Sequence, residues 1–303
     1  MSGTINIETN KNNEHLSLFP PSEGGVAAII GLGLIGGTFA FALRDNKIVS
    51  KIIGVEANEE HAQKALQLGL VDEILPLDKA VAKSDFIILA TPVTVAATQL
   101  PAILDNIDKQ IVIDTGSTKF DIIQSVKDHP KRGRYVASHP MWGTEFSGPE
   151  AAQHNVLRDR VNIICDKDDS DKDALAFVEN FYTKIGMRLV YMNGEAHDTH
   201  LAYVSHISHI TSFALANTVL EKEKEEDTIF NLAGSGFEST VRLAKSNSAT
   251  WVPVFKQNKE NVLDVLNEYI SQLRKFKSSL EKENWEYLNE LIEESNKIKK
   301  ILK

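Results

Sequence analysis

From Val26 onward, short apolar runs rich in β-branched residues alternate with longer stretches in which apolar residues recur every three or four positions. The short runs are typical of buried strands, and the longer stretches are typical of amphipathic helices. Strands that alternate with helices indicate βαβ units and a mostly parallel sheet. The predicted strands are 26–30, 52–55, 86–90, 111–114, 135–137, 161–165 and 188–191, and the predicted helices include 35–44, 59–68 and 171–185.

The pattern changes after Asn193-Gly194, where no further strand is predicted and the rest is expected to be helical. The stretch 195–220 contains neither Gly nor Pro and is apolar on more than one side, which predicts a helix buried in the middle of a bundle. A later seam with spacings of four and three can pack within its own bundle or against a second subunit. Its members are Val262, Leu266, Tyr269, Leu273, Phe276 and Leu280.

The length of 303 residues favours two domains. We therefore expect an α/β fold in which a Rossmann-like, mostly parallel sheet at 25–193 is followed by an all-helical domain at 194–303. Residues 1–24 are a polar leader without the apolar core of a signal peptide, and we expect them to form a frayed tail.

Composition narrows the possible partners. The net charge of -9 argues against nucleic acid and against an anionic membrane, both of which require clustered positive charge. No apolar run approaches the roughly 20 residues that span a bilayer. Cys165 is the single cysteine, so we expect no intramolecular disulfide, no cysteine-based metal site and a reducing, cytoplasmic location. A small anionic substrate needs only one or two local arginines and stays compatible with this charge.

A glycine motif follows the first predicted strand and opens the first predicted helix. In "GLGLIGG", Gly31, Gly33 and Gly36 permit a tight turn and close approach of a pyrophosphate to the backbone around Leu34 and Ile35. Glu56 ends the second strand, 20 residues after Gly36. A carboxylate there binds a ribose 2′-hydroxyl and repels a 2′-phosphate, so the motif predicts NAD as the cofactor rather than NADP.

Three further segments are expected at the same edge of the sheet. Thr91-Pro92 follows the strand at 86–90, and this places the turn beside the nicotinamide half of the cofactor. Ser117 follows Asp114 and either caps the next helix or reaches into the cleft. His139 comes just after the strand at 135–137, where a neutral imidazole can take a proton from a substrate hydroxyl.

Six segments together carry a family resemblance: "GLGLIGG", "TPV", "DTGSTK", "SHPMWGTEFSG", "HDTHLAYVSHISH" and "AGSGFESTVRLAKSNSATW". In this order and spacing the chain resembles the prephenate/arogenate dehydrogenases, oxidoreductases that make the tyrosine precursor. The resemblance covers nearly everything from Val26 to about Asn258. It implies an NAD-binding domain, a helical domain through which two subunits form a homodimer, and an active site between the domains for prephenate or arogenate.

The resemblance also implies roles for individual residues. His139 corresponds to the catalytic histidine, Ser117 to the serine that orients it, and Arg242 to the arginine that binds a substrate carboxylate. Further residues correspond to positions around the substrate pocket or its mouth, namely His209, Thr144, Glu145, His197 and Trp251. The chain departs from the family pattern at Ser239, at Asn247-Ser248 and at Trp142. The resemblance therefore does not predict the detailed carboxylate contacts or the residues that gate the pocket.

Simpler interpretations compete for two of these features. Arg242 lies four residues after Glu238 and could form an exposed helical salt bridge, although Gly234-Ser235-Gly236 would bring a helix N-terminus toward a bound anion. His206 and His209 are spaced like metal ligands, but no carboxylate or cysteine completes a recognisable zinc set, and we expect no metal.

Two other functions fit the same fold. A β-hydroxyacid dehydrogenase or a related imine reductase also joins a Rossmann domain to a helical one, and would use a lysine such as Lys245. A non-enzymatic NAD-sensing dimer would keep the fold without the chemistry. The joint presence of Ser117, His139 and Arg242 favours the dehydrogenase.

Overall fold

The structure is a computed structural model, and it describes residues 6–7, 24–225 and 228–301. Its first part is built on one nine-stranded sheet with the order β1-β9-β8-β7-β6-β5-β2-β3-β4. After β2 the strands β3 and β4 are added on one side of it, and β5, β6 and β7 are then added on the other side. This reversal of the strand order opens a crevice at the carboxyl ends of β2 and β5. The strands are β1 Asn6–Ile7, β2 Val26–Ile30, β3 Lys51–Val55, β4 Glu73–Ile74, β5 Phe86–Leu89, β6 Ile111–Asp114, β7 Tyr135–Pro140, β8 Val161–Cys165 and β9 Arg188–Met192.

The sheet is mostly parallel. The six strands from β7 to β4 in the sheet order pair in parallel, as do β8 and β9. Only β7 with β8 and β1 with β9 run antiparallel. The predicted Rossmann-like sheet is therefore confirmed, and its antiparallel pairs lie beyond the nucleotide-binding half.

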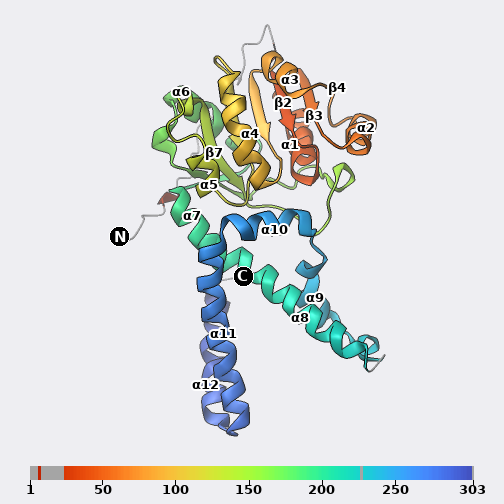
Figure 1. Ribbon diagram of the computed structural model, residues 1–303, viewed down its shortest axis with the longest axis vertical. Coiled ribbons are helices and arrows are strands. Elements are labelled where there is room, and N and C mark those ends of the chain that lie inside the picture. The colour runs from red at the N-terminus through yellow and green to blue at the C-terminus, as the bar shows by residue number, and fades with distance from the viewer. Residues whose placement is uncertain (1–5, 8–23, 226–227, 302–303) are drawn as a thin grey trace.

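Helices cover both faces of the sheet (Figure 1). The two apolar layers alternate along each strand, because Ile29 packs into one layer and its neighbour Ile30 into the other. Buried side chains of α1, α2 and α6 fill the first layer, and those of α3, α4 and α5 fill the second. The helices are α1 Leu34–Asp45, α2 Glu59–Gln67, α3 Leu77–Lys83, α4 Val93–Asp105, α5 Phe120–Gln124 and α6 Lys172–Lys184.

The second part of the chain is helical, as predicted. It starts with a continuous run in which a π-helical turn, Ala202–His206, joins α7 to α8. In Figure 1, α10 lies across the end of the sheet domain, while α8 with α9 and α11 with α12 project away as two arms. The helices are α7 Gly194–Leu201, α8 Ile207–Glu223, α9 Ser235–Val241, α10 Ser248–Gln257, α11 Lys259–Glu281 and α12 Trp285–Ser295.

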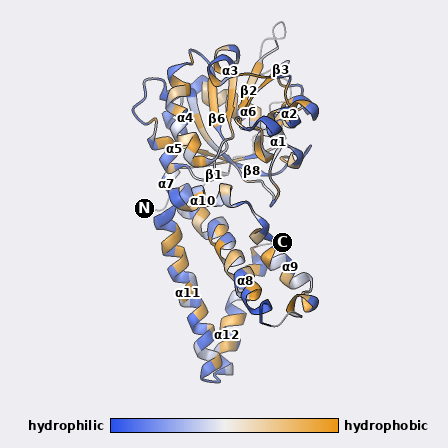
Figure 2. Cartoon of the chain, turned by 45° about the vertical axis from the view of Figure 1, so that its right-hand side comes forward, coloured by the Kyte–Doolittle hydropathy of each residue, from blue (hydrophilic) through white to orange (hydrophobic). Residues whose placement is uncertain are grey.

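Hydrophobic residues lie along both arms (Figure 2), and several of them are exposed. Leu220 of α8 is 51% exposed and Leu273 of α11 is 50% exposed. The prediction that 195–220 lies in the middle of a bundle is wrong for the single chain, because His209 and Ser212 are the only buried residues among those described in α8, and apolar residues such as Leu220 are exposed. Of the seam on α11, only Val262 at its start is buried.

Three strand predictions need correction. β7 continues through Pro140, so His139 belongs to the strand instead of following it. β4 adds a pair of residues that carried no strand signal. Within the expected frayed leader, Asn6–Ile7 forms β1 beside β9, while residues 1–5 and 8–23 lie outside the described part of the chain. None of the described helices is long and apolar enough to cross a membrane.

Candidate functional site

The glycine motif lies between β2 and α1. The backbone requires glycine at Gly31 and Gly36, whereas Gly33 faces open space. Gly31 has φ +93°, and a Cβ there would lie 2.7 Å from the Ala90 carbonyl oxygen. A Cβ on Gly36 would lie 1.9 Å from the Gly31 oxygen, so the helix can meet the strand only through glycine. A Cβ on Gly33 would meet nothing within 4 Å, and no side chain caps α1 at this residue. Free backbone N–H groups and open space at a helix N-terminus fit a pyrophosphate.

Glu56 lies next to this loop, directly after β3. Its two carboxylate oxygens accept hydrogen bonds from the backbone N–H groups of Leu32 (2.8 Å) and Asn58 (3.0 Å). The carboxylate is therefore fixed at the edge of the nucleotide loop, where a ribose would lie. Ile35 packs against the first apolar layer and Leu34 begins α1, so both lie in the turn as predicted.

The Thr91-Pro92 turn lies beside the glycine motif, because Ala90 touches Gly31. Pro92 is the N-cap residue of α4, and the Thr91 hydroxyl donates to Gln99 Oε1 at 3.2 Å. Both residues thus lie at the carboxyl edge of the sheet, at the crevice between β2 and β5.

His139 lies near the end of β7, opposite Ile163 of β8, and is 8% exposed. Its Nδ1 is 2.8 Å from Nε2 of His197, which belongs to α7 and is fully buried. Burial lowers the pKa of His139 well below 6.5, and the nearby His197, Lys119 and His206 lower it further. The imidazole is therefore neutral at pH 7, as a general base must be.

Ser117 lies in the loop between β6 and α5 and is half-buried. It does not cap α5, because the N-cap residue of that helix is Lys119. Burial lowers the pKa of His206, from the π-helical turn, to about 4; the negative charge of Asp198 opposes this shift, the charge of His209 adds to it, and the nearby Ser117 backbone opposes it least. The loop that carries Ser117 is thus in contact with the helical domain.

Asp114 and Lys119 form a fully buried ion pair at the two ends of this loop. Asp114 also accepts hydrogen bonds from the Gly116 N–H (2.8 Å), the Tyr135 hydroxyl (2.7 Å) and the Ser138 N–H (3.2 Å). One carboxylate therefore joins the end of β6, the loop around Ser117 and the strand that carries His139. A buried charge of this kind is stable only with such a full set of partners.

A second cluster, from the helical domain, contains His209 and Trp251. Their rings stack with centroids 3.3 Å apart and an angle of 26°. His209 Nδ1 lies 3.1 Å from the Ser205 carbonyl oxygen, so that Nδ1 donates and Nε2 keeps its lone pair. Burial lowers the pKa of His209 to about 4; the Ser205 carbonyl opposes this shift and the positive charge of Arg242 adds to it.

Arg242 connects the two domains through Glu145, whose Oε2 accepts a hydrogen bond from Nη1 at 3.1 Å. The helical salt bridge with Glu238 does not form; Glu238 instead lies 4.0 Å from Lys245. Arg242 is 51% exposed at its side chain and can exchange this partner for another carboxylate. Thr144, beside Glu145, accepts a hydrogen bond from the Phe146 N–H at 3.3 Å.

Family models match both parts of the chain. Residues 39–191 match the model described as "Prephenate dehydrogenase, nucleotide-binding domain", and residues 193–294 match "Prephenate dehydrogenase, dimerization domain". The chain belongs to the prephenate dehydrogenase family. The predicted family and the predicted nucleotide-binding domain are therefore confirmed.

Relatives and solved structures agree with this family. The chain is 31% identical to "Cyclohexadienyl dehydrogenase" of Zymomonas mobilis, with 91% of this chain and 95% of the relative covered. It is 30% identical to "Prephenate dehydrogenase" of Bacillus subtilis, with 86% and 71% covered. The prephenate dehydrogenase of Aquifex aeolicus, solved in complex with hydroxyphenyl propionate and NAD+, has a TM-score of 0.81 at 31% identity, with 91% and 97% covered.

In this member of the prephenate dehydrogenase family, the predicted residues fall into two groups. His139 and Ser117 contact the helical domain through His197 and His206. Arg242, Glu145, His209 and Trp251 form the other group. The groups are joined at His206, whose ring lies 5.9 Å from that of Trp251 and which also lowers the pKa of His139.

Four buried polar residues of the site were not predicted from the sequence: Asp198, Lys119, Asn258 and His206. His206 was considered only as a possible metal ligand, whereas it is buried beside Asn258. Asn258 donates from Nδ2 to the Asp198 carbonyl (2.7 Å) and to His206 Nδ1 (3.0 Å). Asp198 directly follows His197 in "HDTH", and this adjacency was the one local signal available. Among the described residues, no group of three or more His, Cys, Asp or Glu side chains could hold a metal ion.

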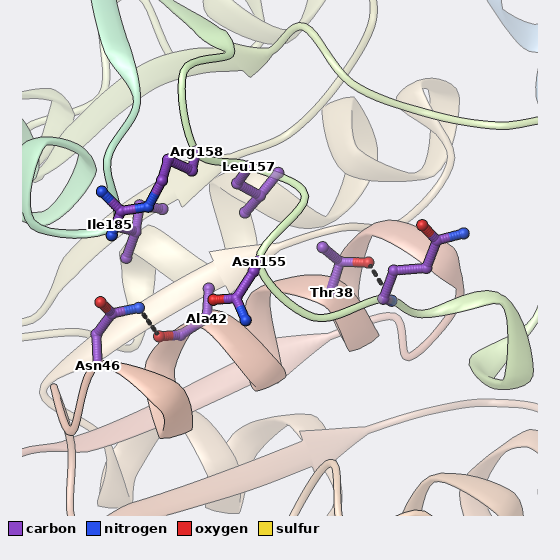
Figure 3. A pocket seen from close by; sticks show the side chains of 8 residues that line it. Thr38, Ala42, Asn46, Asn155, Leu157, Arg158 and Ile185 are labelled. Carbon is purple, nitrogen blue, oxygen red and sulfur yellow. Dashed lines mark hydrogen bonds between the residues drawn. The ribbon is translucent and has the colours of Figure 1, made fainter.

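A small surface pocket lies elsewhere, between α1 and the segment that follows the 3-10 turn at Pro149–Ala151 (Figure 3). Thr38, Asn46, Asn155 and Arg158 line it, and none of the candidate site residues does. It therefore has no part in the chemistry considered below.

Proposed function

We propose that the chain catalyses the NAD-dependent oxidative decarboxylation of prephenate to 4-hydroxyphenylpyruvate. The observation that carries the proposal is a neutral, buried imidazole, His139, at the same sheet edge as an open dinucleotide loop. Family membership supports the reaction class, and the relatives' names support a cyclohexadienol substrate.

NAD fits the residues at the nucleotide loop. Gly31, Gly33 and Gly36 would hold the pyrophosphate at the start of α1, around Leu34 and Ile35, and Glu56 would accept hydrogen bonds from the ribose hydroxyls. Thr91 and Pro92 would flank the nicotinamide. The NAD+ complex of the A. aeolicus enzyme agrees with this assignment.

The residues of this chain would mostly position the reactants. When bound, NAD+ accepts the hydride from ring carbon C4, and departure of carbon dioxide makes the ring aromatic. His139 takes the proton of the C4 hydroxyl. Ser117, in the neighbouring loop, orients the His139 ring and the substrate hydroxyl toward each other. Arg242 binds a substrate carboxylate, so the ring is held at reacting distance. His209, Trp251, Thr144 and Glu145 would line the pocket or its mouth.

We further propose that the chain works as a homodimer through its helical domain. That domain matches a dimerization-domain model, and its arms expose apolar side chains such as Leu220 and Leu273. Exposed apolar faces of this extent are typical of a surface covered by another subunit.

The experiment that tests the function is NADH formation with prephenate and with arogenate in parallel. We expect turnover of prephenate with NAD+ and little turnover with NADP+. Simple 3-hydroxy acids are the control for a β-hydroxyacid dehydrogenase that uses Lys245. Cofactor binding without NADH from any cyclohexadienol would contradict the proposal and favour an NAD-sensing module.

Glu56→Gln should shift cofactor choice. The amide keeps an oxygen for the Leu32 N–H but loses the negative charge that repels a 2′-phosphate. We expect kcat/KM for NAD+ to fall about tenfold, because a hydrogen bond to a charged group contributes at least about 1.5 kcal/mol. We expect kcat/KM for NADP+ to rise. Glu59→Gln, at the exposed start of α2, is the matched control. An unchanged NAD+/NADP+ ratio would remove Glu56 from cofactor selection.

Arg242→Gln should weaken substrate binding. A hydrogen bond between charged groups contributes about 1.5–3 kcal/mol, so we expect KM for prephenate to rise about 10- to 100-fold with kcat largely kept. Steady-state kinetics measure this directly, and Lys245→Gln controls for the loss of a nearby exposed cation. A wild-type KM would mean that Arg242 serves only the interdomain bond to Glu145.

A further inference from the structure

A chain of hydrogen bonds runs from the helical domain to His139. Asp198 is at its far end, where its Oδ1 accepts from the Lys119 N–H (2.7 Å) and its Oδ2 from the Phe120 N–H (2.9 Å). Its Oδ1 also lies 2.7 Å from Nδ1 of His197. Burial raises the pKa of Asp198, while the two backbone N–H donors and the charge of Lys119 lower it. In its ionised form the carboxylate can only accept, so the proton of this pair is on His197 Nδ1.

The ionised state of Asp198 fixes the next link. With its proton on Nδ1, a neutral His197 has a lone pair on Nε2. The atom 2.8 Å from that lone pair is Nδ1 of His139, which must donate to it. The proton of neutral His139 is then also on Nδ1, and Nε2 is left as the free basic nitrogen.

We propose that His197 and Asp198 are positioning residues that keep His139 in the tautomer with a free Nε2 and stabilise its imidazolium during turnover. The inference rests on the proposed function, in which His139 accepts the substrate proton. During the reaction that proton moves from the ring hydroxyl to His139 Nε2 as the hydride leaves C4, and it returns to the same oxygen when loss of carbon dioxide makes the ring aromatic. The arrangement follows the general rule that a catalytic base is oriented by a third group.

The surroundings of His139 explain why a carboxylate is needed. The titratable groups facing it are His197 from α7, Lys119 from the loop before α5 and His206 from the π-helical turn, and a positive charge on any of them lowers the pKa of His139. Asp114 neutralises Lys119 on the far side of that loop. Asp198 is the carboxylate connected to His139 through hydrogen bonds, so it supplies the compensating negative charge.

His197 is fully buried behind His139, and this placement differs from the pocket role that the family resemblance implied. It can reach a substrate only through His139. Because α7 belongs to the helical domain and β7 to the sheet domain, the base is completed only where the two domains meet.

Asp198→Asn is the sharpest variant. The amide has no negative charge, and its single oxygen can serve only one of the two positions that accept from the Lys119 and Phe120 N–H groups, so it no longer stabilises a positive charge on the histidine pair. We expect kcat to fall about 100-fold or more, within the range of general-base catalysis, with KM and the NAD+ dissociation constant within about twofold of wild type. The acid limb of the kcat profile should move to lower pH, because the imidazolium of His139 loses its stabilising carboxylate.

A pair of substitutions at His197 separates positioning from packing. His197→Gln keeps an oxygen that can accept from His139 Nδ1, whereas His197→Leu does not. We expect the Gln variant to keep at least tenfold more kcat than the Leu variant. His200→Gln, at an exposed histidine of the same helix, is the matched control and should behave as wild type. Equal kcat for wild type and His197→Leu would overturn the proposal.

Nitrogen-15 NMR of the histidine rings tests the proposal in the wild-type protein, so it does not depend on any variant folding. We expect protons on Nδ1 of both His139 and His197. A proton on His139 Nε2 in the neutral protein would overturn the inference. Failure of the wild-type enzyme to form NADH from prephenate would instead refute the proposed function, and the two failures are therefore distinct.

Discussion

His139→Asn is expected to lower turnover about 100- to 10,000-fold, the usual contribution of a general base. Asparagine can still lie beside Ile163 in β7, but it cannot take a proton from the substrate hydroxyl. The nucleotide loop is on other strands, so the NAD+ dissociation constant should not change. Steady-state kinetics and cofactor titration measure the two effects, and His154→Asn, at an exposed histidine, is the control.

The pH dependence of the wild-type enzyme follows from the same group. Burial lowers the pKa of His139, so the imidazole stays neutral as pH falls through 6.5 and becomes charged only below it. Activity should therefore be kept at pH 6.5 and lost at lower pH. The protein should also lose stability as pH falls below 6.5, because His139 binds a proton more readily in the unfolded chain than in the folded protein. Turnover that is unchanged in His139→Asn, or an acid limb above pH 6.5, would contradict this role.

Asp114→Ala is expected to lower the free energy of unfolding by about 3–5 kcal/mol, because it leaves the ammonium group of Lys119 buried without a counter-charge. The hydroxyl of Tyr135 and the N–H of Ser138 lose their acceptor at the same time. Chemical denaturation measures the loss. Asp128→Ala, at an exposed residue after α5, should change stability by less than about 0.5 kcal/mol.

A double substitution isolates the charge effect. Asp114→Asn with Lys119→Met removes both charges and should be more stable than Asp114→Asn alone, because replacing a whole buried pair costs less than breaking it. A loss of less than about 1 kcal/mol in Asp114→Ala would show that Lys119 finds water or another partner.

Features that depend on local geometry could be predicted from the sequence. The glycine spacing and Glu56 could be placed because they lie in one βαβ unit, and the change to helices after Asn193 is visible in the pattern of apolar residues. His139 could be proposed as a base from its position near a strand end. These features need no knowledge of how distant segments pack.

Features that depend on packing between distant segments could not be predicted. His197 lies 58 residues after His139, and the contact exists only because α7 docks against the sheet domain. Lysine is rarely buried, so nothing in the sequence indicated that Lys119 would be fully enclosed. Arg242 does not form the i,i+4 salt bridge with Glu238, because α9 ends at Val241 and the chain continues from Arg242 as a 3-10 turn.

The π-helical turn at Ala202–His206 acts as a spacer that sets the angular phase of everything after it. Each residue advances a helix by about 100°, so removing one residue from this turn would carry His206 and His209 round to a different side of the axis. Trp251 would then lose its stacking partner while the fold of both domains persisted. The length of this segment therefore matters to the stacking of His209 on Trp251 as much as the two rings themselves do.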